Sequence, residues 1–209
     1  MDRPHRRVQY MIVVEEAHER DVPSIVSLHA EAFPDSFLTS LGGLFLDWYY
    51  RSIVSSPNGI CLVAIDGGIP IGFVAGRIEP GGNTGFAGLT KLVPFAARLA
   101  VSHPIRLAQL GRRFLWQRRE AETLVEADSE LTSIGSSPQR RGEGIGRKLV
   151  KAFASSVEHA GKRTISLTTD FDQNDEVRSF YESLGFVVAT RFDRDRTMVQ
   201  YIAAIDQIL

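Results

Sequence analysis

Residues 138–149 read Pro-Gln-Arg-Arg-Gly-Glu-Gly-Ile-Gly-Arg-Lys-Leu, and this stretch decides the fold. Its glycines, Gly142, Gly144 and Gly146, have no Cβ, so the backbone can turn tightly and come close to a ligand. A helical period follows, and the face that it predicts consists of Ile145, Leu149, Ala152, Phe153, Ser156 and Ala160. Because a helix N-terminus presents unpaired N–H groups and a partial positive charge, the stretch predicts a phosphate-binding loop. The simpler alternative is a glycine-rich turn before a surface helix.

Two common phosphate-binding motifs fit this loop less well. A Walker A loop needs Gly-Lys followed by Ser or Thr, whereas Arg147 separates Gly146 from Lys148 here and Leu149 follows. In a dinucleotide-binding fingerprint the third glycine comes one residue later than it does in this chain.

The spacing Gln139-x-x-Gly142-x-Gly144 resembles the acetyl-CoA pyrophosphate loop of the GNAT family of N-acetyltransferases. A strand precedes that loop in the family, here Leu131 to Ile134, and another strand follows the helix, here Thr164 to Thr169. Further on, the run 174–186 contains Asn, then Phe-Tyr, then Gly-Phe, and is similar to a second conserved block of the family. The resemblance is strong over 129–192 and fair over 11–77, and it fails over 78–128.

The resemblance implies an α+β fold with a central mixed, mostly antiparallel sheet of six or seven strands flanked by helices. The hydrophobic pattern agrees, because strand and helix signals alternate along the chain. Strands are expected at 11–15, 60–66, 69–77, 131–134, 164–169, 186–192 and 198–203, and helices at 21–33, 41–55, 145–160 and 174–184. We expect a flexible tail at 1–9, one domain over 10–209, and a helical insertion, about 78–128, between the third and fourth strands.

The resemblance also assigns residues to acetyl-CoA. Main-chain groups of Ile134 and Ser136 are expected to pair with the pantetheine arm, and the amides of Arg141, Gly142, Gly144, Ile145 and Gly146 to cradle the pyrophosphate. Side chains of Gln139 and Arg141 are expected to add contacts, with Arg140 as the alternative to Arg141. Asn174 resembles a pantetheine-contacting residue, and a helix N-cap is its structural alternative.

Two residues are predicted to be catalytic. Tyr181 matches the family's proton donor to the leaving thiolate, while its alternative is a core aromatic beside an apolar helix face of Val177, Phe180 and Leu184. Glu130 opens the strand before the loop, where some family members keep a carboxylate that deprotonates the amine, and its pKa would have to be raised for this role. Glu126 and Asp128 are competing candidates, and a solvated strand-end acid is the structural alternative for Glu130.

The composition is that of a soluble globular chain, with 44 % hydrophobic and 23 % charged residues in 209. The net charge of −1 argues against a nucleic-acid partner, and the single cysteine, Cys61, argues against a disulfide framework. The histidines show no zinc-site spacing, so no metal is expected. No apolar run reaches the length of a transmembrane helix, and the N-terminus lacks a secretion signal, so a cytoplasmic location is expected.

The insertion gives the chain its individual character. From 86 to 119 it holds seven Lys or Arg residues and no Asp or Glu. Such a one-sided block is typical of an electrostatic role, and the readings are an anionic acceptor, a homodimer surface or a weak contact with an anionic membrane surface. A helical hairpin with a solvated basic face is the alternative.

The chain is thus predicted to transfer acetyl from acetyl-CoA directly to a primary amine of a small, anionic acceptor. Alternatives are a longer-chain acyltransferase and a non-catalytic acyl-CoA-binding regulator. The presence of both Tyr181 and the glycine loop argues against the last of these.

Overall fold

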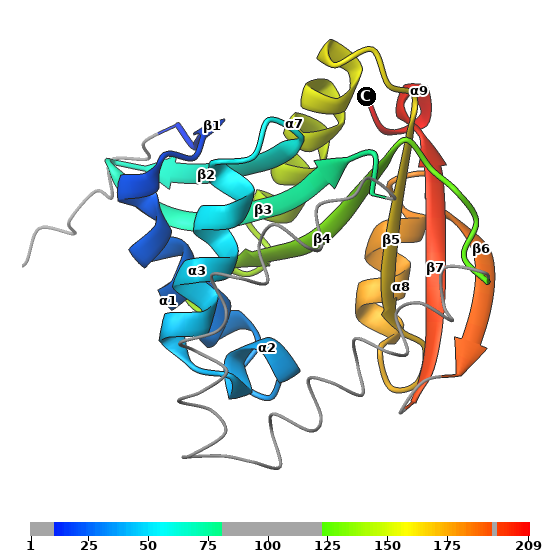
Figure 1. Cartoon of the computed structure of the whole chain (residues 1–209), viewed down its shortest axis with the longest axis horizontal. Helices are drawn as coiled ribbons and strands as arrows, with labels where there is room; N and C mark the ends of the chain where they lie inside the picture. The colour runs from blue at the N-terminus through cyan, green and yellow to red at the C-terminus, as the bar shows by residue number, and fades with distance from the viewer. Residues whose placement is uncertain (1–10, 81–122, 194–195) are drawn as a thin grey trace, which may run out of the picture.

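The computed structural model describes residues 11–80, 123–193 and 196–209, and these form a seven-stranded sheet with helices on both faces (Figure 1). The strands are β1 (Val13–Glu16), β2 (Gly59–Asp66), β3 (Ile69–Ile78), β4 (Ser129–Ser136), β5 (Thr164–Asp170), β6 (Val187–Asp193) and β7 (Thr197–Ala204). The helices are α1 (Val22–Ala32), α2 (Phe37–Ser40), α3 (Gly43–Val54), α7 (Ile145–His159), α8 (Asp175–Glu182) and α9 (Ile205–Ile208), with short 3-10 turns at Glu19–Asp21 and Pro138–Arg140.

The strand order is β1-β2-β3-β4-β5-β7-β6. Among the strand pairs of the described sheet, β4 and β5 are parallel and the others are antiparallel. A parallel pair needs a crossover connection, and α7 provides it by returning the chain from the end of β4 to the edge of the sheet where β4 begins. The predicted α+β fold with a mixed, mostly antiparallel sheet is therefore confirmed.

The sheet divides where β4 and β5 meet. Their ladder contains only Ser129 opposite Ile165 and Glu130 opposite Ser166, whereas β4 stays paired with β3 as far as Ser136. Beyond these two pairs the strands diverge, and we call this place the β4–β5 fork (Figure 1). Ile134 to Ser136, the β4 residues expected to contact the pantetheine arm, lie beyond the last β4–β5 pair and therefore beside the fork.

A β-bulge lies at the start of the fork. Ala75 is opposite Ser133 and Gly76 is opposite Leu131, so Thr132 is the extra residue on β4. The Thr132 hydroxyl donates to the Ala75 carbonyl at 3.1 Å and accepts from the Tyr49 hydroxyl at 3.2 Å. Because a bulge bends its strand, it contributes to turning β4 away from β5 at this position.

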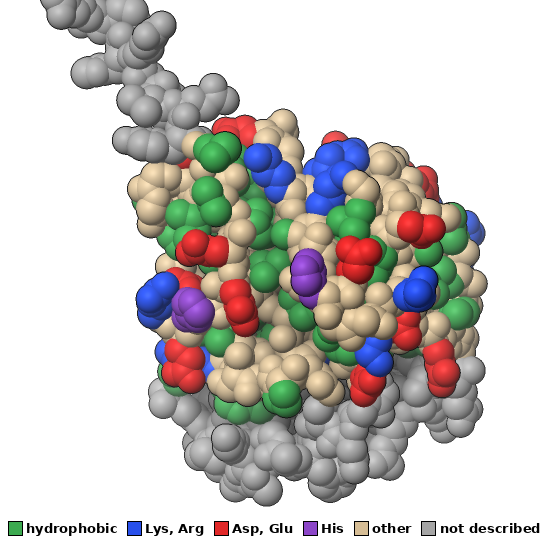
Figure 2. Space-filling model, turned by 90° about the horizontal axis from the view of Figure 1, so that it is seen from above, with side chains coloured by type: hydrophobic (Ala, Val, Ile, Leu, Met, Phe, Trp, Pro, Cys, Tyr) green, Lys and Arg blue, Asp and Glu red, His purple; other side chains and the backbone are tan. Residues whose placement is uncertain are grey.

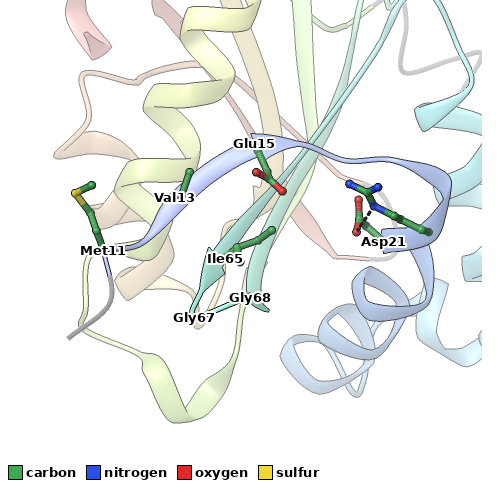
Figure 3. A pocket seen from close by; sticks show the side chains of 8 residues that line it. Met11, Val13, Glu15, Asp21, Ile65, Gly67 and Gly68 are labelled. Atoms are coloured by element: carbon green, nitrogen blue, oxygen red, sulfur yellow. Dashed lines mark ion pairs between the residues drawn. The ribbon is translucent and has the colours of Figure 1, made fainter. Parts of the chain in front are cut away.

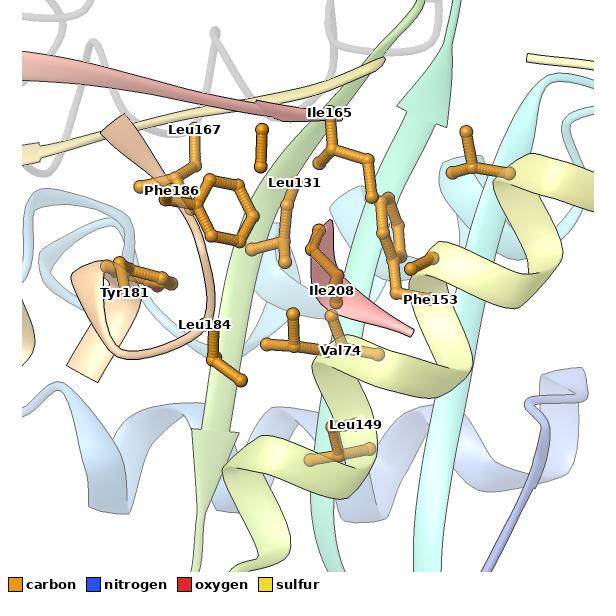
Figure 4. Packing of buried hydrophobic residues seen from close by; sticks show 14 of the residues in the cluster. Val74, Leu131, Leu149, Phe153, Ile165, Leu167, Tyr181, Leu184, Phe186 and Ile208 are labelled. Atoms are coloured by element: carbon orange, nitrogen blue, oxygen red, sulfur yellow. The ribbon is translucent and has the colours of Figure 1, made fainter. Parts of the chain in front are cut away.

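Two hydrophobic cores cover the two faces of the sheet. α7 and α8 cover one face, with Leu149, Phe153 and Leu184 among the packed side chains (Figure 4). α1 and α3 cover the other, where Tyr50 and Phe73 are fully buried. Each face of the central strands is therefore shielded from water, which explains the long apolar run in β2.

The buried face of α7 is wider than the period predicted. Ile145, Leu149 and Phe153 are buried as expected, together with Val150, Ala154 and Val157. Ala152 and Ser156 are half-buried and Ala160 is exposed, so the last part of the predicted face was wrong. The reason is that α9 also packs against α7 and buries a second side of it.

Short elements escaped the sequence reading. The helix expected at 41–55 is α3, and α2 precedes it as a separate turn capped by Ser36, whose hydroxyl accepts from the Thr39 amide at 3.1 Å. Gly42 divides the two helices with a φ of 93°, which suits glycine. α9 is only four residues long, too short for a period to be visible.

The expected tail at 1–9 and the expected helices of the insertion lie outside the described residues. The two ends of the insertion are among the described residues. They lie side by side, and the Glu79 amide donates a hydrogen bond to the Asp128 carbonyl at 2.8 Å. Val125 is held by the Gln200 side chain through two hydrogen bonds of 2.9 Å. Within the described ranges, no helix is long and apolar enough to cross a bilayer.

A buried histidine joins α1 to α3. His29 is 3 % exposed, and its Nδ1 lies 2.6 Å from the Tyr50 hydroxyl. Its Nε2 is 3.4 Å from the Ser36 hydroxyl, and the ring packs on Phe33 and Phe73. Burial among these rings lowers the pKa of His29 from an ordinary value of 6.5 to about 4, so the imidazole is neutral in the folded protein at neutral pH.

Stability is therefore expected to fall as the pH drops from 6.5 to 4. The unfolded chain binds a proton on His29 throughout this window and the folded chain does not, which lowers the free energy of unfolding by up to about 3 kcal/mol. Urea unfolding at several pH values measures this slope. In His29→Gln the slope is expected to be shallower, whereas His159→Gln, at an exposed site, is expected to keep it. Equal slopes in wild type and His29→Gln would contradict this account.

Candidate active site

The glycine loop connects β4 to α7. Gly142 and Gly144 have φ values of 83° and 75°, in the left-handed region that glycine adopts without strain. Among the described residues other than the adjacent ones in the chain, none has an atom within 4 Å of the place where a Cβ would stand at either position, so this side of the loop is open. α7 begins at Ile145, directly after Gly144, and its first amides point toward this loop. The loop thus has the geometry of an anion site at a helix N-terminus.

Gly146 serves a different purpose from the other two glycines. A Cβ there would lie 3.2 Å from the Phe180 ring, tighter than ordinary packing. The missing side chain lets the first turn of α7 lie directly against α8. The missing Cβ of Gly146 is therefore explained by helix packing, and the predicted contact of its amide with the pyrophosphate stays a prediction.

The two arginines of the loop differ in their surroundings. Arg140 donates to Glu143 at 2.8 Å and to Asp66 at 2.8 Å, and both partners belong to the protein. Arg141 is exposed. The Arg140 side chain thus points toward other side chains of the protein, whereas the Arg141 side chain faces solvent. Gln139 is also exposed and accepts a 2.5 Å hydrogen bond from the Ser137 hydroxyl.

Asn174 occupies the N-cap position of α8 without capping it through its side chain. Its amide instead donates to the Thr169 hydroxyl at 2.9 Å and to the Asp170 carbonyl at 3.0 Å. Asn174 therefore ties the start of α8 to the end of β5, one arm of the fork. The structural alternative is thus confirmed for the position of Asn174 but not for a capping hydrogen bond from its side chain, and the pantetheine contact stays a prediction.

Tyr181 lies on the buried side of α8. It is 6 % exposed and packs against Phe180, Phe186 and Tyr201, with ring centroids 5.2, 5.7 and 6.3 Å away (Figure 4). Burial raises the pKa of Tyr181 well above its ordinary value of 10, so its proton is retained at neutral pH. Val177, expected on the apolar face of this helix, is 39 % exposed, whereas Leu184 is buried as expected.

The three candidate carboxylates are in distinct environments. Glu130 is half-buried in the last pair before the fork, opposite Arg77 on β3, and its role as the base stays a prediction. Asp128 accepts hydrogen bonds of 2.9 to 3.0 Å from the amides of Arg163 and Thr164 and from the Thr164 hydroxyl. The Arg163 amide is the largest cause that lowers the pKa of Asp128, so this carboxylate stays ionised and joins the starts of β4 and β5. Glu126 is exposed and precedes the strand.

The predicted cofactor residues lie along one path beside the fork. Ile134 and Ser136 lie in the part of β4 that pairs with β3 but not with β5, where they are opposite Val74 and Gly72. The glycine loop follows directly after β4. Polar neighbours that sequence reasoning missed are Tyr49 and Thr132, because a bulge and a contact between residues 83 positions apart leave no sequence pattern.

A second hollow lies at the β1 edge, far along the strand order from β5 (Figure 3). Its lining consists of Met11, Val13, Glu15, Arg20, Asp21, Ile65, Gly67 and Gly68. The charged pair in it, Arg20 and Asp21, is 3.8 Å apart, and Arg20 is largely exposed. No set of nucleophile and base gathers there among these eight residues, so the fork is the stronger candidate.

Other residue sets offer little chemistry within the described ranges. Groups of three or more His, Cys, Asp or Glu side chains that could hold a metal ion are absent from them. Cys61 is buried, and burial raises the pKa of its thiol to about 12, so it is unreactive at neutral pH. Figure 2 shows acidic, basic and apolar side chains interspersed over one face, and the basic block 86–119 lies outside the described residues.

Fold, fork and glycine loop together define an acyl-CoA-dependent acetyltransferase class, and comparison with known proteins places the chain in it. The model of the acetyltransferase (GNAT) family matches residues 22–186. The chain belongs to the GNAT family, and the resemblance seen in the sequence is confirmed.

Among named relatives, the chain is 36 % identical over 68 residues to the 5-NmdU N-acetyltransferase of Pseudomonas phage PaMx11, a match that covers 32 % of this chain and 46 % of that protein. The chain thus spans about half the length of this relative.

Solved structures share the fold at low identity. A GNAT-family acetyltransferase from Desulfovibrio desulfuricans matches with a TM-score of 0.60 at 13 % identity, over 93 % of this chain and 99 % of that one. The yncA protein of Salmonella typhimurium, solved with its cofactor acetyl-CoA, matches with a TM-score of 0.56 at 17 % identity, over 94 % of this chain and 95 % of that one.

Proposed function

We propose that this protein transfers acetyl directly from acetyl-CoA to a primary amine of a small, anionic acceptor. The observation that carries the proposal is the β4–β5 fork, with the glycine loop at the end of β4 and Tyr181 on the helix that follows β5. Binding of acetyl-CoA by the structural neighbour from Salmonella typhimurium supports the choice of donor.

The chain's groups fit acetyl-CoA at this place. Gly142 and Gly144 leave open space beside the α7 N-terminus, where anionic phosphates are stabilised. The β4 backbone at Ile134 and Ser136 has no β5 partner in the described sheet, so its polar groups are available to an extended arm. Arg141 is exposed at the loop and adds positive charge.

Acetyl-CoA brings an acetyl group already activated as a thioester, so the protein has to orient it and manage protons. Tyr181 holds a proton on its hydroxyl at neutral pH, the state required of a donor to a departing sulfur. Glu130 lies at the apex of the fork, where a carboxylate can accept a proton from an amine directly or through water. Proton donor and acceptor thus come from opposite arms of the fork.

The acceptor is proposed from charge. All seven charged residues of the block 86–119 are Lys or Arg, which attracts an anionic acceptor and repels a basic peptide. The phage relative is named a 5-NmdU N-acetyltransferase. Because the phosphates of a nucleotide are negatively charged, an amine attached to a nucleotide heads the list of acceptors. A non-catalytic acyl-CoA-binding regulator and a longer-chain acyltransferase are the alternatives.

A panel of amines incubated with acetyl-CoA tests the function through release of free thiol. Nucleotide-linked amines, neutral amino sugars and basic peptides separate the acceptor classes, and butyryl-CoA tests the chain length. Because Cys61 is buried, the protein adds little background to a thiol reagent. Acetyl-CoA binding without thiol release on any amine would favour the regulator.

Glu130→Gln is expected to lower the rate about 10²-fold near neutral pH and less at high pH, where the amine is already deprotonated. A pH profile of kcat/KM for the acceptor measures this. Glu126→Gln is the matched control, because that carboxylate is exposed and outside β4. A Glu130→Gln profile that coincides with wild type would show that another group, or water, accepts the proton.

A further inference from the structure

Arg140 forms an ion-pair cluster inside the glycine loop. Its Nε donates to both carboxylate oxygens of Glu143 at 2.8 Å, and one terminal nitrogen lies 2.8 Å from Asp66 and 2.7 Å from Glu143. The Arg140 and Asp66 side chains are only 28 % and 17 % exposed. The Arg140–Asp66 pair is therefore shielded from solvent more than an ordinary surface ion pair, whereas the Glu143 side chain is 40 % exposed.

The two acids of this cluster lie where a phosphate ligand would be repelled. Glu143 stands between Gly142 and Gly144, the two positions with left-handed backbone that face open space. Asp66 ends β2, directly before the turn at Gly67 and Gly68. Two carboxylates beside a pyrophosphate disfavour binding unless a cation compensates them.

We propose that Arg140 is a positioning residue that neutralises Glu143 and Asp66 and tethers the glycine loop to the β2–β3 turn. The proposal rests on the proposed function, because it takes the loop to be the pyrophosphate site. Arg140 thus acts on acetyl-CoA indirectly, while the exposed Arg141 remains available for direct contact.

The tether also joins distant parts of the chain. Arg140 and Asp66 are 74 positions apart, and the Ser137 amide, just before the loop, donates to the Ile71 carbonyl of β3 at 2.8 Å. Both contacts hold the loop against the same hairpin before any ligand arrives. A loop ordered in advance loses less conformational entropy on binding.

Arg140→Gln is expected to raise the Kd for acetyl-CoA about tenfold to a hundredfold, because it removes charged hydrogen bonds and exposes two acids to the phosphates. The value of kcat at saturating acetyl-CoA is expected to stay unchanged. Arg163→Gln removes one positive charge at the turn before β5 and is the matched control, with an expected Kd like that of wild type. Calorimetric titration with acetyl-CoA measures the affinities.

The double variant that combines Glu143→Gln with Arg140→Gln tests whether the lost affinity comes from an uncompensated negative charge or from a disturbed loop structure. Because it also removes the charge of Glu143, one of the two acids that Arg140 compensates, the double variant is expected to recover part of the lost affinity. S-acetylpantetheine, which lacks the pyrophosphate, is expected to react equally well with wild type and Arg140→Gln. Arg140→Lys, which keeps the charge without the fork of donors, is expected to have an intermediate Kd and is the second variant if Arg140→Gln does not fold.

Three results would overturn the proposal. The first is a Kd for acetyl-CoA that is unchanged in Arg140→Gln, and the second is a double variant that binds acetyl-CoA no better than Arg140→Gln. The third is a reaction with S-acetylpantetheine that Arg140→Gln impairs as much as the reaction with acetyl-CoA. Failure of the proposed function looks different, because wild type itself would then bind no acetyl-CoA.

Discussion

Tyr181→Phe is expected to lower kcat by about 10²- to 10⁴-fold while the affinity for acetyl-CoA stays the same. The substitution removes a hydroxyl whose proton is retained at neutral pH and keeps the ring that packs on Phe180 and Phe186. Steady-state kinetics with the acceptor identified by the amine panel, together with titration of acetyl-CoA, measures both quantities.

Tyr201→Phe is the matched control for this loss. Tyr201 is a neighbouring buried tyrosine on β7, and its hydroxyl donates to Glu182 at 2.7 Å. Its removal is expected to cost stability and to leave kcat unchanged. If Tyr181→Phe turns over at the rate of wild type, the phenol only packs in the core, and solvent or another group must protonate the thiolate.

Gly144→Asp is expected to abolish acetyl-CoA binding. The carboxylate would stand beside the phosphates at the α7 N-terminus, and the residue would have to adopt a φ of 75°, which is strained for a side chain. Since no atom lies within 4 Å of the new Cβ, the free protein has room for the side chain and is expected to fold. Titration with acetyl-CoA tests the binding, and circular dichroism tests the fold.

Gly161→Asp provides a close control, because it places the same charge at the other end of α7. Gly161 has a φ of 73° and equally open surroundings, so its backbone strain is similar. This variant is expected to lose stability and to bind acetyl-CoA like wild type. Unchanged affinity in a folded Gly144→Asp protein would remove the pyrophosphate from this loop.

The sequence by itself determined the order of strands and helices, the start of α7 and the family. These features depend on local patterns: apolar runs in β2 and β3 on either side of Gly67 and Gly68, glycines before a helical period, and two motif blocks in the right order. Such patterns can be recognised in the sequence because each depends on residues that are only a few positions apart in the chain. The candidate residues on β4 could be named from sequence for the same reason.

Only the tertiary structure decided which of several similar side chains faces which partner. Arg140 and Arg141 are adjacent and chemically alike, and Asp66, 74 positions away, is what draws Arg140 inward. Asp128 and Glu130 are likewise similar in sequence, and what distinguishes them is the contact of Asp128 with the amides of Arg163 and Thr164, which keeps the Asp128 carboxylate ionised. Contacts between distant segments depend on how the sheet brings strands together, so no local pattern in the chain reveals them.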